Sequence, residues 1–134
     1  MGTATIIYKG NLRTKCIHNN SNSELITDAP IDNMGKGESF SPTDLIVTAL
    51  ASCVLTIIGI YCNNINLSFT NGSVEVDKIM DTNPRRISAI NLTLNIENNG
   101  WNDKTINKVV KAAKNCPVFY SINSAIKIKW KIIS

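Results

Sequence analysis

The sequence predicts a single α+β domain covering residues 1–134. Three observations support this prediction. A chain of 134 residues has the size of one ordinary domain. Hydrophobic residues make up 43% of the chain and charged residues 18%, a balance typical of a packed core and not of disorder. Segments with strand-like alternation of apolar residues are interspersed with two segments of helical periodicity.

Three strands are expected in the first part of the chain. Residues 3–9 and 11–19 indicate two strands joined by a tight turn at Gly10. A third, short strand is expected over residues 24–27. Residues 29–41 are rich in proline and glycine and predict a loop.

The strongest local signal is a helix start after this loop. Ser41 offers an N-cap hydroxyl, Pro42 takes the first helical position, and Asp44 supplies a carboxylate where a capping box usually has Glu. The helix is expected to end near Tyr61 or Cys62.

This helix is apolar on almost every side. Residues 45–61 contain no charged side chain, but the stretch is marginally short for a membrane span, and no basic flank anchors either end. We therefore expect a buried central helix, covered by sheet or by a second subunit, and no membrane partner. Four small or polar residues form a stripe along which another helix can approach closely: Thr48, Ser52, Thr56 and Gly59.

Two longer strands and a second helix are expected next. The strands cover residues 72–82 and 85–97, and the second of them alternates clearly between apolar and polar residues. An amphipathic helix begins near Asn102 or Asp103. It must end before Pro117, because the residue that precedes a proline is driven out of the helical region.

The chain closes with a short helix over residues 117–124 and a strand over 126–133. One face of this strand carries three lysines, which we interpret as a solvated edge and not as a phosphate-binding patch. They are Lys127, Lys129 and Lys131.

Composition argues against several classes of protein. The net charge is only +4 and scattered apart from a C-terminal cluster, so no nucleic-acid partner is expected. The first residues show no secretory signal, which predicts a cytoplasmic location. In a reducing compartment the four cysteines should be thiols.

Two of the cysteines are candidate reactive thiols. Cys116 precedes the short helix that starts at Pro117, where unpaired amides and the positive end of the helix dipole lower a thiol pKa. Cys53 lies within the apolar helix and by itself is an ordinary core cysteine. Cys16 and His18 share one face of a strand, but the further ligands of a zinc site are missing, so no metal is expected.

Two segments match the motifs of a known family. The first comprises residues 40–45 (FSPTDL) and 49–53 (ALASC), and the second comprises residues 116–118 (CPV). Together with the order of strands and helices, they resemble the OsmC-like proteins, which include the osmotically inducible and organic hydroperoxide resistance proteins. The resemblance covers essentially the whole chain.

The resemblance implies a fold in which β-sheets of both subunits wrap around two central helices in an intertwined homodimer. It implies that Cys53 attacks a peroxide and becomes a sulfenic acid. Cys116 would then resolve this acid to a disulfide, which an unknown thiol reductant opens. No cofactor is implied.

The sequence departs from the peroxidase members of the family at two positions. Those members carry a Glu directly after the helix-starting proline and an Arg in the loop before it. Thr43 and Asn33 stand at these positions here. The candidates for a replacement cation near the first cysteine are Arg13, Arg85 and Arg86.

We therefore predict a thiol-dependent peroxidase that reduces organic hydroperoxides in the oxidative stress response, with Cys53 and Cys116 as its redox pair. Two alternatives stay open. One is a dimer that holds a small hydrophobic ligand without peroxidase activity, in a pocket lined for example by Leu50, Val54 and Phe119; the other is a different cysteine-dependent reaction. The sequence does not decide the roles of Cys16, Cys62 and His18.

Overall fold

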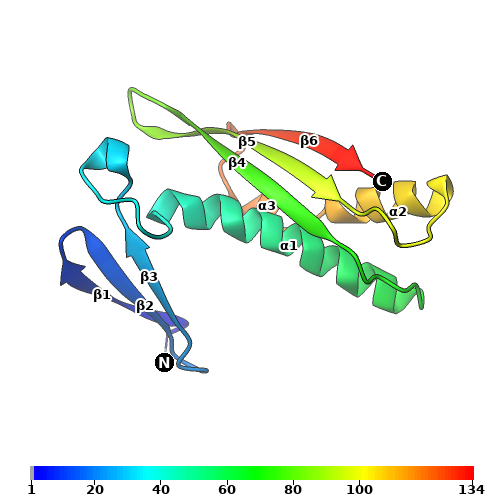
Figure 1. Ribbon diagram of the computed structural model, residues 1–134, viewed down its shortest axis with the longest axis horizontal. Coiled ribbons are helices and arrows are strands. Elements are labelled where there is room, and N and C mark those ends of the chain that lie inside the picture. The colour runs from blue at the N-terminus through cyan, green and yellow to red at the C-terminus, as the bar shows by residue number, and fades with distance from the viewer. Residues whose placement is uncertain (1) are drawn as a thin grey trace. The chain divides into compact units, whose positions relative to one another are not determined.

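The structure, a computed structural model, describes residues 2–134 (Figure 1). The chain divides into two compact units, Met1–Ile46 and Val47–Ser134, and the division falls near the start of the first helix. Strands and helices both occur, in the order expected from the sequence. The α+β prediction is confirmed.

The first unit is built on an antiparallel sheet of three strands in the order β1–β2–β3. These strands are β1 (Ala4–Gly10), β2 (Arg13–His18) and β3 (Glu24–Asp28). The tight turn between β1 and β2 lies where it was predicted, and Gly10 has a φ of 82°, a conformation that glycine adopts without strain. A 3₁₀ helix, η1 (Ile31–Asn33), interrupts the loop that follows.

The helix α1 (Pro42–Asn64) begins with the predicted capping box. The Asp44 amide donates to Ser41 Oγ at 3.1 Å, and the Ser41 amide donates to Asp44 Oδ2 at 2.9 Å. Two amides at the start of the helix are thereby satisfied. By length and composition α1 is also able to cross a membrane, with a mean hydropathy of 2.4, but the core helix of a soluble protein meets the same criteria.

The second unit contains a mixed sheet in the order β4–β5–β6. Its strands are β4 (Ser73–Asp81), β5 (Arg86–Asn95) and β6 (Lys127–Ile133). The strands β4 and β5 form an antiparallel hairpin, whereas β5 and β6 run parallel. Parallel neighbours need a crossover connection, which here contains the helices α2 (Asp103–Ala113) and α3 (Pro117–Ser121).

The hydrophobic core of the second unit lies between the helices and one face of this sheet. Leu50, Val54 and Ile58 of α1 are fully buried, as are Ile90 and Leu94 of β5. The alternation of β5 confirms the predicted inward and outward faces. The predicted bounds differ from the observed ones by at most three residues, the largest difference being at the end of α3.

The short helix α3 ends at Ser121, before the predicted residue 124. Ile122 already has extended backbone, with φ −92° and ψ 164°. The Asn123 side chain then accepts a hydrogen bond from the Ala125 amide at 2.8 Å. This local side-chain bond competes with helix continuation, a common behaviour of Asn.

Candidate functional site

Cys53 lies in the middle of α1, on the part of the helix that belongs to the second unit. Its side chain is half-buried. Leu50 and Val54, on the buried side of the helix, are fully buried, whereas the neighbouring Ser52 is exposed. The rigid helix therefore holds this sulfur at the boundary between the core and the surface.

Cys116 lies in the turn between α2 and α3 and is only 1% exposed. Pro117 at the first position of α3 prevents α2 from continuing, and Cys116 becomes the N-cap of α3. The Phe119 amide donates a hydrogen bond to its Sγ at 3.3 Å. The predicted position of this thiol at a helix start is confirmed.

The structure brings Cys53 and Cys116 together. Burial is the largest influence on the Cys116 thiol and raises its pKa, and the amides of Phe119 and Val118 oppose it. A side-chain hydrogen bond with Cys53, together with the electrostatic effect of that thiol, raises the pKa of Cys116 further. Two neighbouring thiols form a dithiol site, which an oxidant can convert to a disulfide.

The direction of this pKa shift corrects the expectation drawn from the sequence. The amides at the start of α3 do lower the pKa of Cys116, as expected for a helix start. Burial outweighs them, because the thiolate loses more stabilisation when it is removed from water than the two amide hydrogen bonds provide. The pKa of the Cys116 thiol therefore lies above its ordinary value, and this thiol holds its proton more tightly than a free cysteine does.

A pair of side chains braces the turn that carries Cys116. The Tyr120 hydroxyl donates to Asn115 Oδ1 at 2.7 Å, and Asn115 Nδ2 donates to the carbonyl of Lys111 at 3.1 Å. Asn115 thus joins the last turn of α2 to α3. No sequence pattern singles out these two residues, because the contact depends on the angle at which the two helices meet.

An apolar groove of about 210 Å³ lies beside α3. It is lined by Phe119, Tyr120, Ile122, Asn123, Ser124, Ile126 and Ile128. Phe119 lines this groove, whereas Leu50 and Val54 are fully buried in the core of the second unit and are not among its lining residues.

The candidate cation Arg13 lies in the first unit, on β2, and is engaged by two carboxylates. Its guanidinium is 2.8 Å from Glu38 Oε2 and 3.4 Å from Asp28 Oδ2. The hydrogen bond to Glu38 and the charges of both carboxylates raise the pKa of Arg13. Asp28 is 1% exposed, and this burial raises the pKa of its carboxyl. The hydrogen bond from the Glu38 amide and the charge of Arg13 outweigh burial, so the pKa is lowered overall.

The candidates Arg85 and Arg86 lie at the hairpin between β4 and β5, and both are exposed. The Arg86 guanidinium donates to the carbonyls of Thr82 and Pro84, each at 2.9 Å, and contacts Asp81 at 3.4 Å. These contacts hold Arg86 on its own hairpin. Neither arginine is turned toward the interior of this unit.

The two positions that depart from the peroxidase pattern also have local roles. The Thr43 hydroxyl is 3.3 Å from the Ser41 hydroxyl, within the first turn of α1. Asn33 is the last residue of η1, is exposed, and its amide donates to the carbonyl of Pro30 at 3.0 Å.

All four cysteines are free thiols. Cys62 is buried near the end of α1, and burial raises its pKa. Cys16 is half-buried on β2, with its sulfur 3.8 Å from the Thr14 hydroxyl. His18 Nδ1 lies 2.6 Å from the Ser21 hydroxyl. Within residues 2–134, no group of three or more His, Cys, Asp or Glu side chains is placed to hold a metal ion.

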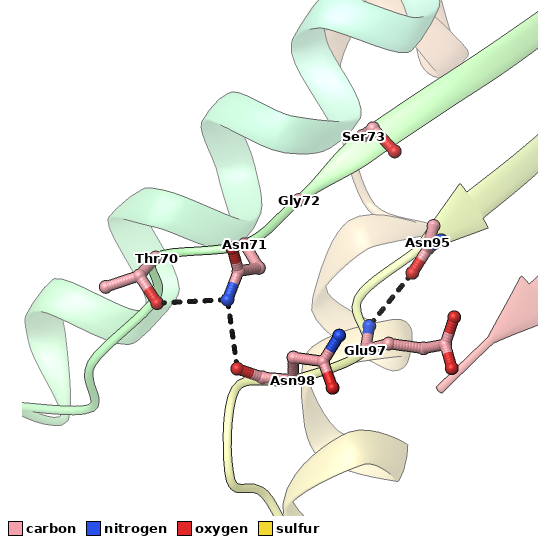
Figure 2. Close-up of a pocket in the computed structure, with 7 residues that line it drawn as sticks. All are labelled: Thr70, Asn71, Gly72, Ser73, Asn95, Glu97 and Asn98. Carbon is pink, nitrogen blue, oxygen red and sulfur yellow. Dashed lines mark hydrogen bonds between the residues drawn. The ribbon is translucent and has the colours of Figure 1, made fainter.

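A polar cavity of about 370 Å³ lies away from these thiols, between the loops that precede β4 and follow β5 (Figure 2). The cavity is lined by Thr70, Asn71, Gly72, Ser73, Asn95, Glu97 and Asn98. Asn71 donates to the carbonyl of Asn98 at 2.9 Å, and the Glu97 amide donates to Asn95 at 3.0 Å. The first bond fastens the two loops to each other and the second lies within the loop after β5, so both have a structural role.

The sequence model of the OsmC-like proteins matches residues 35–131. No curated protein matches the chain.

Solved structures match over nearly the whole chain. A Psychrobacter arcticus protein, whose name refers to osmotic stress induction and a detoxification response, is 45% identical with a TM-score of 0.92, over 98% of this chain and 96% of that one. The organic hydroperoxide resistance protein OsmC of Legionella pneumophila is 18% identical with a TM-score of 0.78, over 100% and 98%. The organic hydroperoxide resistance protein OhrB of Bacillus subtilis is 15% identical with a TM-score of 0.66, over 98% of each chain. The last two similarities establish the fold.

Proposed function

The chain belongs to the OsmC-like protein family, and from this premise we propose that it is a thiol-dependent peroxidase for organic hydroperoxides. The contact between Cys53 and Cys116 is the observation that carries the proposal. Two thiols far apart in the sequence, one on α1 and one in the buried turn before α3, influence each other, and the apolar groove begins on α3 at Phe119. The names of the Legionella and Bacillus structures refer to resistance to the same class of peroxide.

In the proposed reaction, the Cys53 thiolate attacks one oxygen of the peroxide bond. A sulfur–oxygen bond forms, the oxygen–oxygen bond breaks, and the organic alkoxide leaves and takes up a proton to become an alcohol. Cys53 is then a sulfenic acid. The Cys116 sulfur attacks the Cys53 sulfur, the disulfide forms, and the hydroxyl of the sulfenic acid leaves as water with the proton of Cys116.

The raised pKa of Cys116 suits the second step. Burial keeps its proton in place until the sulfenic acid needs one to release water. Two thiols of an external reductant then reopen the disulfide and restore both cysteines. Such a cycle requires a reducing compartment, which agrees with the cytoplasmic location predicted from the sequence.

The proposal extends to a homodimer. The side of α1 that faces away from the core of the second unit carries exposed small and apolar residues: Ala49, Ser52, Thr56 and Ile60. The sheet of the first unit exposes large apolar residues on both faces, such as Ile6 and Ile7, which are 58% and 43% exposed. Exposed apolar surface of this kind is typical of an interface between copies of a chain.

The experiment is peroxide oxidation of the purified, reduced protein with cumene hydroperoxide. Free thiols are counted over time and disulfides are mapped by mass spectrometry. Cys53→Ser and Cys116→Ser test the pair, and Cys16→Ser is the matched control, since that thiol is also half-buried and lies outside the dithiol site. Arg13→Met, Arg85→Met and Arg86→Met test which cation, if any, accelerates the first step.

We expect a rapid Cys53–Cys116 disulfide in the native protein and in Cys16→Ser. Neither Cys53→Ser nor Cys116→Ser should form it, and Cys116→Ser should accumulate a sulfenic acid that dimedone traps. Survival of all thiols in excess peroxide would overturn the peroxidase proposal.

A second candidate function is binding of a small apolar ligand without peroxide chemistry, which the groove beside α3 favours. Titration with cumyl alcohol, the product of the reaction above, distinguishes the two candidates. Perturbation of Phe119 and Ile128 signals in NMR spectra, in a protein whose thiols survive peroxide, would support ligand binding alone.

A further inference from the structure

The charged side chains in the last part of the chain are all positive. Residues 104–134 contain seven lysines and neither Asp nor Glu, although the chain as a whole has ten carboxylates. All seven lysines are exposed. A surface with one sign of charge concentrates ions of the opposite sign near it.

Three of these lysines form a stripe along α2. Lys104, Lys108 and Lys111 have the spacing i, i+4 and i+7, which places them on one side of a helix. Val109 and Ala113 lie on the opposite side and are fully buried. The stripe therefore faces solvent along most of the helix.

The lysine stripe (Lys104, Lys108 and Lys111) leads to the dithiol site. Asn115 continues it by one turn, and Cys116 is the next residue. Lys114 adds a fourth cation to the same end of α2, with its ammonium 5.5 Å from the centre of the Trp130 ring. Lys111 and Lys114 thus place two positive charges at the end of α2, directly before the turn in which the disulfide would form.

We propose that the lysine stripe attracts a small thiol reductant that carries carboxylate groups to the Cys53–Cys116 disulfide. This inference rests on the proposed function. A small molecule fits better than a protein partner, because Cys116 is 1% exposed and Cys53 is half-buried, so that a slim thiol reaches the sulfurs most easily.

The reduction consists of two exchange steps. The thiolate of the reductant attacks one sulfur of the disulfide, a mixed disulfide forms, and the other cysteine leaves as a thiolate. A second reductant thiolate attacks the sulfur of the first reductant molecule, so that the protein thiolate leaves and an oxidised reductant disulfide is released. The two protons of the reductant thiols end on Cys53 and Cys116.

The test separates reduction from peroxide chemistry. Diamide first oxidises the full-length protein to the Cys53–Cys116 disulfide, so that no peroxidase activity is required. The disulfide is then reduced by three thiols of similar size and different charge: 3-mercaptopropionate, 2-mercaptoethanol and cysteamine. Rates are expressed per concentration of thiolate and compared between protein variants for each thiol, which cancels the intrinsic reactivity of the probe.

The decisive comparison is between two triple variants with the same change in net charge. One is Lys104→Gln with Lys108→Gln and Lys111→Gln on α2. The control is Lys127→Gln with Lys129→Gln and Lys131→Gln on β6. These control lysines alternate with Ile128 and Trp130, which pack toward the core, and so lie on the other face of the sheet.

In 20 mM salt we expect the α2 triple variant to slow reduction by 3-mercaptopropionate, whose thiolate form carries two negative charges, about threefold. Reduction by cysteamine should not change, because the ammonium group of this thiol balances its thiolate. Reduction by 2-mercaptoethanol, whose thiolate carries one negative charge, should slow less than reduction by 3-mercaptopropionate, and the β6 control should show less than half of either effect. At 0.5 M salt the differences should vanish. If the triple variant folds poorly, Lys111→Gln alone should show a smaller change in the same directions.

Equal responses of the two triple variants would overturn the inference, as would an equal slowing of reduction by 3-mercaptopropionate and by cysteamine. Failure of the proposed function would give a different experimental result. In that case cumene hydroperoxide produces no disulfide, while the charge dependence of reduction after diamide treatment is still measurable.

Discussion

The two units of the chain are stabilised in contrasting ways. Among residues 2–134, every buried hydrophobic residue of the core belongs to the second unit, from Val47 onward. The buried residues of the first unit are polar, namely Thr27, Asp28 and Ser41, and the unit exposes apolar side chains such as Ile6 and Met34. One unit has a hydrophobic core, and the other has an ion network and hydrogen bonds.

This difference indicates what each unit contributes. Burial of apolar surface is the dominant stabilising effect in folding, so the second unit has the means to hold the dithiol site rigidly. A three-stranded sheet with exposed apolar faces has little of this stabilisation on its own. The first unit therefore depends on covering by another surface, and a second copy of the chain is the partner that we propose.

The largest effect should follow from a cavity in the second unit. Ile90 on β5 is fully buried, and Ile90→Ala should lower the free energy of unfolding by about 3 kcal/mol because it removes apolar contacts and leaves a void. Ile79→Ala on β4 is the matched control, since Ile79 is 41% exposed, and it should cost less than about 1 kcal/mol. Urea unfolding followed by circular dichroism measures both. Similar losses for the two variants would contradict the assignment of the core.

A second prediction concerns the two faces of the first sheet. Ile6 and Leu25 both pair with Cys16 and share one face, whereas Ile7 and Ile26 both pair with Lys15 and share the other. In the proposed dimer, a partner copy covers one face and leaves the other in water. One double variant, either Ile6→Thr with Leu25→Thr or Ile7→Thr with Ile26→Thr, should therefore raise the dimer dissociation constant about 30-fold, which corresponds to about 2 kcal/mol.

Analytical ultracentrifugation of both double variants measures this effect, and each is the control for the other. Threonine keeps the strand preference of the replaced residues, so the sheet itself should persist. Monomeric native protein, or two variants that both remain dimers, would refute the dependence of the first unit on a second copy.

The sequence was most informative where structure is decided locally. The start of α1 could be predicted because Ser41, Pro42 and Asp44 form their hydrogen bonds within one turn. The two faces of β5 could be predicted because strand periodicity repeats every second residue. Both motifs that resemble the family include such a local helix start.

Features that depend on contacts between residues far apart in the sequence could not be predicted in this way. Periodicity and helix signals do not place Cys53 near Cys116, a pairing that only the family resemblance implied, and burial of Cys116 reverses the pKa shift expected from its helix position. Arg13 has the right charge for a peroxide site, but its pairing with Glu38 depends on how the loop folds back on β2. The identity of the cation at the thiols stays a prediction for Arg13, Arg85 and Arg86.

A third prediction concerns the ion network of the first unit at acid pH. The pKa of Asp28 is lowered from its ordinary value of 3.8, so its carboxylate stabilises the folded state fully above that value. This contribution is lost as the pH falls through the lowered pKa. Asp28→Asn should be less stable than the native protein at neutral pH and should lose less stability between pH 5 and pH 2, as measured by urea midpoints. Parallel acid profiles would show that the network does not stabilise the fold.

The smallest effect is expected at the brace beside Cys116, where the second unit has hydrogen bonds instead of apolar packing. Tyr120→Phe removes the hydroxyl that donates to Asn115 but keeps the ring that lines the groove. Because Tyr120 is exposed, loss of this bond should slow formation of the Cys53–Cys116 disulfide only about threefold. The first step, oxidation of Cys53, should keep its rate, since the bond acts on the turn of Cys116 and not on α1.

Stopped-flow mixing with cumene hydroperoxide separates the two steps by the lifetime of the dimedone-reactive sulfenic acid. A uniform slowing of both steps would mean that Tyr120 supports the fold in general, whereas a longer sulfenic acid lifetime alone identifies it as a positioning residue for the second thiol.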